Sequence, residues 1–241
     1  DGPYAERAGF GTIAEAMSTL AHCTGQPDGP PTLPPIALAD EVTGWQGAFA
    51  VMVALYHRDR TGRGQVIDAN LLESLIDIVG PGPAIYHRTG YVQGRQGSRL
   101  SFSAPRNVYR CANGYAVLSG SANEVALRIF DAIGRPELRN DARFTTGAAR
   151  LAHVDELDAI IEAWTSTRTV AEVVETLSAA GAACGPVYDV AQLVADAHVR
   201  ARRSFIEVPS PDGEGPVLQL APTPRLSRTP GSVRHAGLAA G

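Results

Sequence analysis

One stretch of the chain constrains its fold more than any other, a long helical pattern that is apolar on nearly every side. Between Glu41 and Asp59, large apolar side chains recur every three or four residues. They are Trp45, Phe49, Met52 or Val53, and Tyr56. A helix with so little polar surface is typically buried between the layers of a larger fold. We therefore expect this helix to be covered on both sides and to end just before Gly62, after a basic last turn.

The first part of the chain alternates helix and strand patterns. An apolar helical spacing over residues 9–24 stops at Gly25, and Gly64–Asp68 predicts a short strand before a helix at 69–79. Such close alternation favours an α/β layer, so residues 1–80 are expected to belong to a large α/β domain. Residues 81–105 are rich in Gly, Pro, Ser and Arg, and this composition predicts a linker.

The second part of the chain predicts a small α+β domain over residues 106–190. Asn113-Gly114 indicates a hairpin turn between two short strands. Helices are expected at about 122–133, 155–165 and 169–180, the last with Thr169 and Glu172 as a capping box. Residues 191–241, with strands near 204–208 and 216–220, are expected to return to the large domain.

Composition excludes several function classes. The formal net charge of −4 gives no positive field for nucleic acid, and no apolar run is long enough to span a membrane. Three widely spaced cysteines favour free thiols in a reducing compartment, so we expect a cytoplasmic protein. The six histidines are scattered, and we expect no metal site.

Asp40 stands directly before the long apolar helix. Taken alone, an Asp at this place with Thr43 three residues later predicts a helix N-cap, whose side chain accepts a hydrogen bond from a first-turn amide. A second interpretation, a nucleophilic carboxylate, depends on a wider resemblance.

Several segments along the chain resemble the class III CoA-transferases, the CaiB/BaiF or formyl-CoA transferase-like proteins. The most specific are Ala39–Gly44 and Arg60–Gln65, which flank the apolar helix. The others are Gly2–Phe10, Gly134–Leu138, Asp141–Phe144, Gly185–Val187 and the segment 215–231. The resemblance implies a partial Rossmann-like large domain plus a small α+β domain, joined by extended linkers. It also implies a fragment, without the N-terminal Rossmann-like half and the extreme C-terminus, from a protein that forms an interlocked homodimer.

The resemblance gives Asp40 the role of the nucleophile. CoA would move from an acyl-CoA to a carboxylic acid through an aspartyl-CoA thioester on Asp40, with acyl-CoA as substrate and no permanently bound cofactor. The resemblance also implies that Gly94, Gly97 and Ser98 belong to a glycine-containing loop that closes on the site in the family, and we expect these three residues to bind CoA. Two alternatives stay open: an acyl-CoA racemase or epimerase, and a non-catalytic remnant that only oligomerises.

Two positions depart from the family pattern. Transferases of this kind usually carry an acidic residue at the place of Gly11, and related racemases carry a histidine at the place of Phe10. Phenylalanine cannot transfer protons, which disfavours the racemase. Glu15, one helical turn after Gly11, is a candidate substitute for the missing acid, although we expect it to be a solvated helix residue.

Overall fold

The computed structural model describes residues 2–213 and 215–237. The chain before the first sheet is helical, with α1 (Gly11–Met17), α2 (Leu20–Cys23), α3 (Leu38–Thr61), α4 (Leu71–Val79) and α5 (Gly82–Thr89). A single helix over residues 9–24 is a wrong prediction, because Thr19 takes a left-handed φ of 75° and separates α1 from α2. Helix α5 lies inside the stretch expected to be a linker.

The strand predicted at Gly64–Asp68 does not form. The segment is extended, but no other described segment pairs with it, and Val66 is 96% exposed. A strand needs a neighbour to satisfy its backbone groups, so an apolar pattern without one remains an extended connection.

Helix α3 is the longest element and is mostly uncovered. It ends as expected at Gly62, whose amide donates to Arg58 O at 2.8 Å. Only Ala39 among its residues is buried, so the prediction of a helix covered on both sides is wrong for this chain. Its large apolar side chains face solvent, among them Trp45, Phe49, Met52 and Tyr56. We call these four residues the α3 apolar face.

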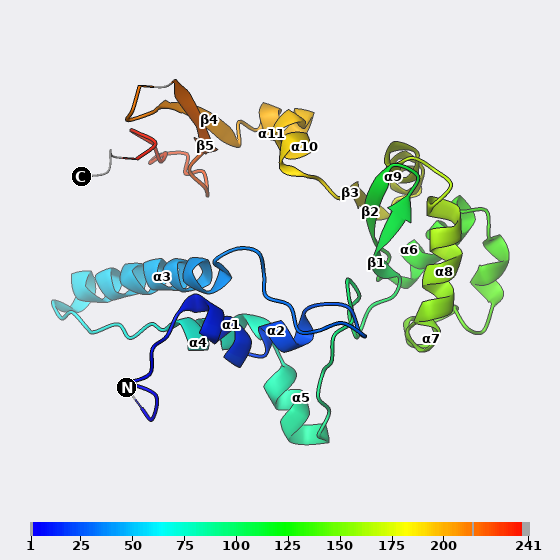
Figure 1. The fold of residues 1–241 in the computed structure, drawn as a ribbon, viewed down its shortest axis with the longest axis horizontal. Coiled ribbons are helices and arrows are strands. Elements are labelled where there is room, and N and C mark those ends of the chain that lie inside the picture. Colours follow the sequence, from blue (N-terminus) through cyan, green and yellow to red (C-terminus); the bar gives the residue numbers. More distant parts are fainter. Residues whose placement is uncertain (1, 214, 238–241) are drawn as a thin grey trace.

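The whole chain is open in shape. In Figure 1, α1–α4 lie at one end, the three-stranded sheet with its helices at the other, and the β4–β5 hairpin stands apart from both. Its accessible surface is 16271 Å², whereas a compact monomer of this size exposes about 10,000 Å². About 6,000 Å² of surface that a compact domain would cover is therefore exposed.

The second half of the chain forms a packed α+β unit. Strands β1 (Arg106–Cys111), β2 (Gly114–Ser119) and β3 (Ala183–Pro186) make an antiparallel sheet in the order β1-β2-β3. The predicted hairpin is confirmed, with Asn107 opposite Leu118. The helical segments are α6 (Asn123–Ala132), η1 (Pro136–Asn140), α7 (Gly147–Ala152), α8 (Val154–Thr165) and α9 (Val170–Ala179). The capping box of Thr169 and Glu172 at the start of α9 is also confirmed.

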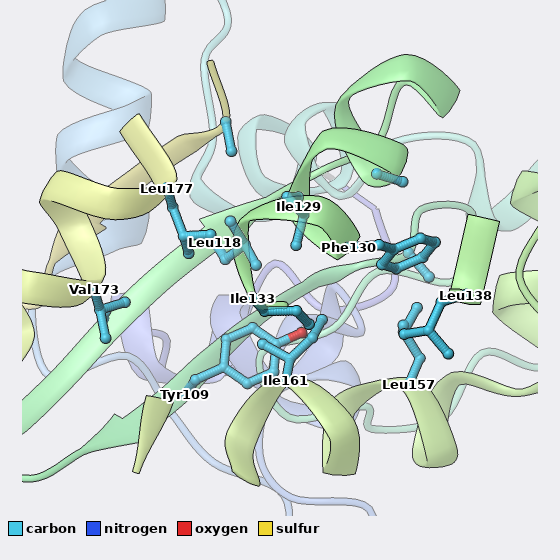
Figure 2. Close-up of a cluster of buried hydrophobic side chains, with 14 of the residues drawn as sticks. Tyr109, Leu118, Ile129, Phe130, Ile133, Leu138, Leu157, Ile161, Val173 and Leu177 are labelled. Carbon is cyan, nitrogen blue, oxygen red and sulfur yellow. The ribbon is translucent and has the colours of Figure 1, made fainter. Parts of the chain in front are cut away.

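The main hydrophobic core belongs to this unit. Figure 2 shows side chains from β1, β2, α6, η1, α8 and α9 pointing toward one another, with Phe130 and Leu138 at one end and Val173 at the other. A second, small cluster joins Ala14 of α1, Ala39 of α3 and Leu75 of α4. The described side chains thus form two separate clusters, and the second one holds the start of α3.

A buried arginine helps to hold the core. Arg150 on α7 is 0% exposed. Its guanidinium donates to Ala104 O at 2.8 Å, Phe144 O at 3.0 Å and Asn123 Oδ1 at 2.8 Å. These carbonyl oxygens replace water for a charge that has no carboxylate partner among the described residues.

A second polar cluster ties the linker to this unit. Asp158 on α8 is buried and accepts hydrogen bonds from Arg99 Nε at 2.6 Å, Asn107 Nδ2 at 2.9 Å and the Tyr109 hydroxyl at 2.5 Å. Burial and the Asp158 charge raise the pKa of Tyr109 well above its usual range, so the hydroxyl stays protonated and donates a hydrogen bond to Asp158. Arg99 thereby fixes the end of the linker against α8.

The C-terminal part contains α10 (Val190–Ala195), α11 (Ala197–Ala201) and the hairpin of β4 (Phe205–Pro209) and β5 (Pro216–Leu220). Both strands lie close to the predicted ranges, with Phe205 opposite Leu220. Within the described ranges, no helix combines the length and apolar character needed to cross a membrane.

Candidate active site around Asp40

Asp40 lies in the first turn of α3, not before it. The N-cap is Ala37, which has no side-chain hydrogen bond to offer, so the prediction of Asp40 as the cap is wrong. The helix starts earlier because Leu38 and Ala39 are good helix formers, and because Ala39 packs against Ala14 and Leu75. Tertiary packing therefore moved the helix start upstream of the polar residue that local preference favours.

This shift leaves the Asp40 carboxylate unengaged. The side chain is exposed, and no described residue forms a hydrogen bond or ion pair with it. A carboxylate that accepts no hydrogen bonds from helix amides is a better nucleophile than one that does. The carboxylate still lies at the N-terminal end of α3, which is the positive end of the helix dipole.

Gly11 lies directly beside this carboxylate. A Cβ atom added at Gly11 would lie 2.6 Å from Asp40 Oδ2 and 3.4 Å from the Ala39 side chain. The backbone of α1 thus approaches Asp40 more closely than any residue with a side chain would allow. The absence of an acidic residue at position 11 is what leaves room for this position of the carboxylate.

Glu15 is buried next to the same helix start, so the expectation of a solvated residue is wrong. Glu15 is only 4% exposed, and its Oε1 atom accepts a hydrogen bond from the Ala39 amide at 3.3 Å. The signal in the sequence is the spacing of Gly11, Ala14 and Glu15, which places the three on one face of α1. That face packs on α3, where its partner lies 24 residues away in the chain.

The first-turn amides of α3 are divided among different acceptors. The Leu38 amide donates to Ile36 O at 2.8 Å, and the Ala39 amide to Glu15. The Asp40 amide has no partner among the described residues. The Asp40 amide is therefore the first-turn donor that is left free among the described residues.

A hollow of about 450 Å³ lies in front of Asp40. It is formed by the start of α1, the loop before α3 and the first turn of α3. Its lining residues are Phe10, Gly11, Thr12, Glu15, Leu33, Pro34, Pro35, Ile36, Ala37 and Asp40. Phe10, at the place where a racemase needs a histidine, is 77% exposed at the rim. Two carboxylates and an aromatic ring thus face one space, without a histidine or a cysteine.

The loop with Gly94, Gly97 and Ser98 lies elsewhere. Among the described residues, these three do not line the hollow with Asp40. The Gly97 amide donates to Gly25 O at 2.9 Å, and the carbonyl of Ser98 accepts a hydrogen bond from Arg106. Of the two glycines, Gly94 has nothing within 4 Å of an added Cβ atom, whereas at Gly97 this atom would lie 3.0 Å from Gln26 Oε1. The loop is therefore fastened to the segment after α2 and to β1.

Metal and thiol chemistry have few candidates near the site. Within residues 2–213 and 215–237, no group of three His, Cys, Asp or Glu side chains is placed to hold a metal ion. The three cysteines are free, and Cys111 and Cys184 lie in the β-sheet unit. Burial raises the pKa of the Cys184 thiol to about 11, with a smaller contribution from Cys111.

Comparison with known proteins gives one consistent result. The family model of CoA-transferase family III matches residues 1–237. The succinyl-CoA–D-citramalate CoA-transferase of Chloroflexus aurantiacus is 38% identical over 241 residues, 100% of this chain and 60% of the relative. The succinyl-CoA–L-malate CoA-transferase beta subunit of the same organism is 36% identical over 242 residues, 98% of this chain and 59% of the relative.

Solved structures agree with these relatives. The crystal structure of a CAIB/BAIF family protein from Brucella suis matches with a TM-score of 0.81 and 30% sequence identity. The match covers 99% of this chain and 62% of that chain. The mixed α/β fold predicted from the sequence is thereby confirmed, and the chain spans about 60% of the length of the relatives it matches.

Proposed function

Because the chain belongs to CoA-transferase family III, we propose that it acts in the transfer of CoA from an acyl-CoA to a free carboxylic acid, with Asp40 as the nucleophile. One observation carries the proposal: an exposed carboxylate without a hydrogen-bond partner, at a helix start, facing a hollow. A carboxylate is ionised at neutral pH, so this nucleophile needs no base to activate it.

The proposed reaction exchanges one carboxylate for another at every step. An Asp40 Oδ atom attacks the thioester carbonyl carbon, the C–S bond breaks, and CoA leaves as thiolate. A mixed anhydride between Asp40 and the donor acid remains. The thiolate then attacks Cγ of Asp40, which releases the donor acid and leaves an aspartyl-CoA thioester. The acceptor carboxylate repeats these two steps in reverse, so the new acyl-CoA forms and the Asp40 carboxylate is restored. No net proton is taken up or released.

The free Asp40 amide and the α3 dipole would stabilise the negative charge that develops on each tetrahedral oxygen.

The substrates we propose are short dicarboxylic acids, because the two relatives above are named for transfer from succinyl-CoA to D-citramalate and L-malate. Gly94 is the part of the loop with space to approach CoA, whereas the Gly97 amide is already bonded.

Phe10 argues against the racemase alternative. It occupies the rim of the hollow and has no titratable proton.

We also propose a homodimer in the cytoplasm. The exposed α3 apolar face supports the dimer, and the three unpaired cysteines support the cytoplasm.

The test is covalent trapping on Asp40. The protein, expressed from its complete reading frame, is incubated with succinyl-CoA and quenched with hydroxylamine, which converts an aspartyl thioester or anhydride to a hydroxamate. We expect the added mass on the peptide that contains Ala39–Gly44. The label and the transfer activity should be lost in Asp40→Asn and kept in Glu41→Gln, a matched change in the same turn.

The fold should survive these changes. Since Asp40 makes no cap, Asp40→Ala loses only its interaction with the helix dipole, about 0.3–1 kcal/mol. Full transfer by Asp40→Asn would place the nucleophile elsewhere. A wild-type protein without label or transfer would favour the non-catalytic remnant, and exchange of the substrate α-proton with solvent would favour the racemase.

A further inference from the structure

A buried carboxylate outside the proposed reaction holds the helix that carries Asp40. Glu15 is 4% exposed, and its described partner is the amide of Ala39, the residue before Asp40. Burying a charged group is unfavourable unless hydrogen bonds compensate it. The hydrogen bond from the Ala39 amide compensates the burial of Glu15, so this contact at the start of α3 is the first place to look for the role of Glu15.

Helix α3 lacks a cap of its own. Its N-cap residue is Ala37, which has no side-chain acceptor for the first-turn amides. Glu15 supplies that acceptor from α1 and adds a negative charge at the positive end of the helix dipole. The missing local cap is thus replaced by a residue from another helix.

The backbone on both sides of Ala39 is held. Its amide donates to Glu15 Oε1 at 3.3 Å, and its carbonyl accepts from Thr43 Oγ1 at 2.7 Å. The Ala39 side chain is fully buried against Ala14. The next residue, Asp40, extends into the hollow from this fixed point, close to Gly11 on the same face of α1.

We propose that Glu15 is a positioning residue for Asp40: through the Ala39 amide it fixes the first turn of α3 and so the place from which the Asp40 carboxylate enters the hollow. This inference rests on the proposed function of Asp40. It differs from a proton-transfer role, because an acceptor oxygen is sufficient for it and a negative charge is not required.

The test compares Glu15→Gln, which keeps an acceptor oxygen, with Glu15→Ala, which removes it; Glu41→Gln is the control for a charge lost in the same turn. The first readout is the Ala39 amide, observed by NMR. Its hydrogen exchange should accelerate about fivefold or more in Glu15→Ala and little in Glu15→Gln.

The second readout is the rate of transfer with succinyl-CoA as donor. We expect kcat to fall at least about tenfold in Glu15→Ala, with KM within about twofold, because the nucleophile is misplaced while binding remains. Glu15→Gln should recover most of kcat. Equal losses in Gln and Ala would overturn the positioning role in favour of a charge or proton-transfer role. An Ala39 amide indifferent to Glu15→Ala would remove its basis.

The two readouts separate the two proposals. If the wild type transfers no CoA, the proposed function fails, while the Ala39 amide still shows whether Glu15 holds the turn. If Glu15→Ala does not fold, Glu15→Asp takes its place, because its shorter side chain draws the acceptor oxygen away from the Ala39 amide. Hydrogen exchange of that amide no faster in Glu15→Asp than in the wild type would then remove the basis of the positioning role.

Discussion

Replacing Gly11 by alanine should separate stability from activity. Gly11 is the first residue of α1 and has an ordinary φ, so alanine gains less than the roughly 1 kcal/mol that it would gain in a helix interior. The new Cβ would lie 2.6 Å from Asp40 Oδ2, too close for a stable contact. The obstacle is the far end of an exposed, flexible side chain, so Asp40 rotates away at a cost of about 0.5–1.5 kcal/mol. We expect the free energy of unfolding to stay within about 1 kcal/mol of the wild type.

Activity should respond very differently. Displacement of the Asp40 carboxylate by about 1 Å is expected to lower kcat between about tenfold and a hundredfold. The assays are urea unfolding and the yield of Asp40 hydroxamate from succinyl-CoA. Gly47→Ala is the matched control, because it lies in α3 with nothing within 4 Å of its added Cβ.

A double-mutant cycle isolates the contact. In an Asp40→Ala background, Gly11→Ala should show its full helix gain, and the difference between backgrounds measures the clash. Unchanged transfer by Gly11→Ala would refute the geometry, since the carboxylate would then not need its place beside α1.

Two further predictions concern the β-sheet unit. Arg150→Met keeps most of the side-chain volume but leaves the oxygens of Ala104, Phe144 and Asn123 unbonded, so urea unfolding should show a loss of about 2–4 kcal/mol; a loss below about 1 kcal/mol would mean that water replaces the guanidinium. Burial holds the pKa of Cys184 at about 11 against a usual 9.0. The unfolded thiol ionises first as pH rises, so the free energy of unfolding should fall between these values and be constant below them. Cys184→Ser should make that slope shallower without removing it, because burial also raises the pKa of Cys111 and of Tyr109. An equal slope in both proteins would contradict the assignment.

Elements specified by neighbouring residues were predictable from the sequence. Asn113-Gly114 fixes the β1–β2 turn, and the Thr169–Glu172 box fixes the start of α9, because in both the partners are within a few residues. Gly62 likewise ends α3 through a contact only four residues back.

Features that need a distant partner were not predictable. Gly64–Asp68 has the pattern of a strand but no strand beside it, and the start of α3 depends on contacts of Ala39 with α1 and α4. For the candidate site, the sequence indicated Asp40, but its engagement as a cap was wrong. The burial of Glu15 was missed because its partner amide lies on another helix.

The α3 apolar face also contains an intrinsic fluorophore, Trp45. The chain has two tryptophans. Trp45 is 61% exposed on α3, whereas Trp164 is partly buried in the β-sheet unit with the Arg168 guanidinium 4.4 Å from its ring centre. Indole emission moves to shorter wavelength as water is removed, so covering α3 would shift the Trp45 signal and shield it from iodide quenching. In a Trp164→Phe background, intrinsic fluorescence would therefore report occupancy of this helix directly, without a dye.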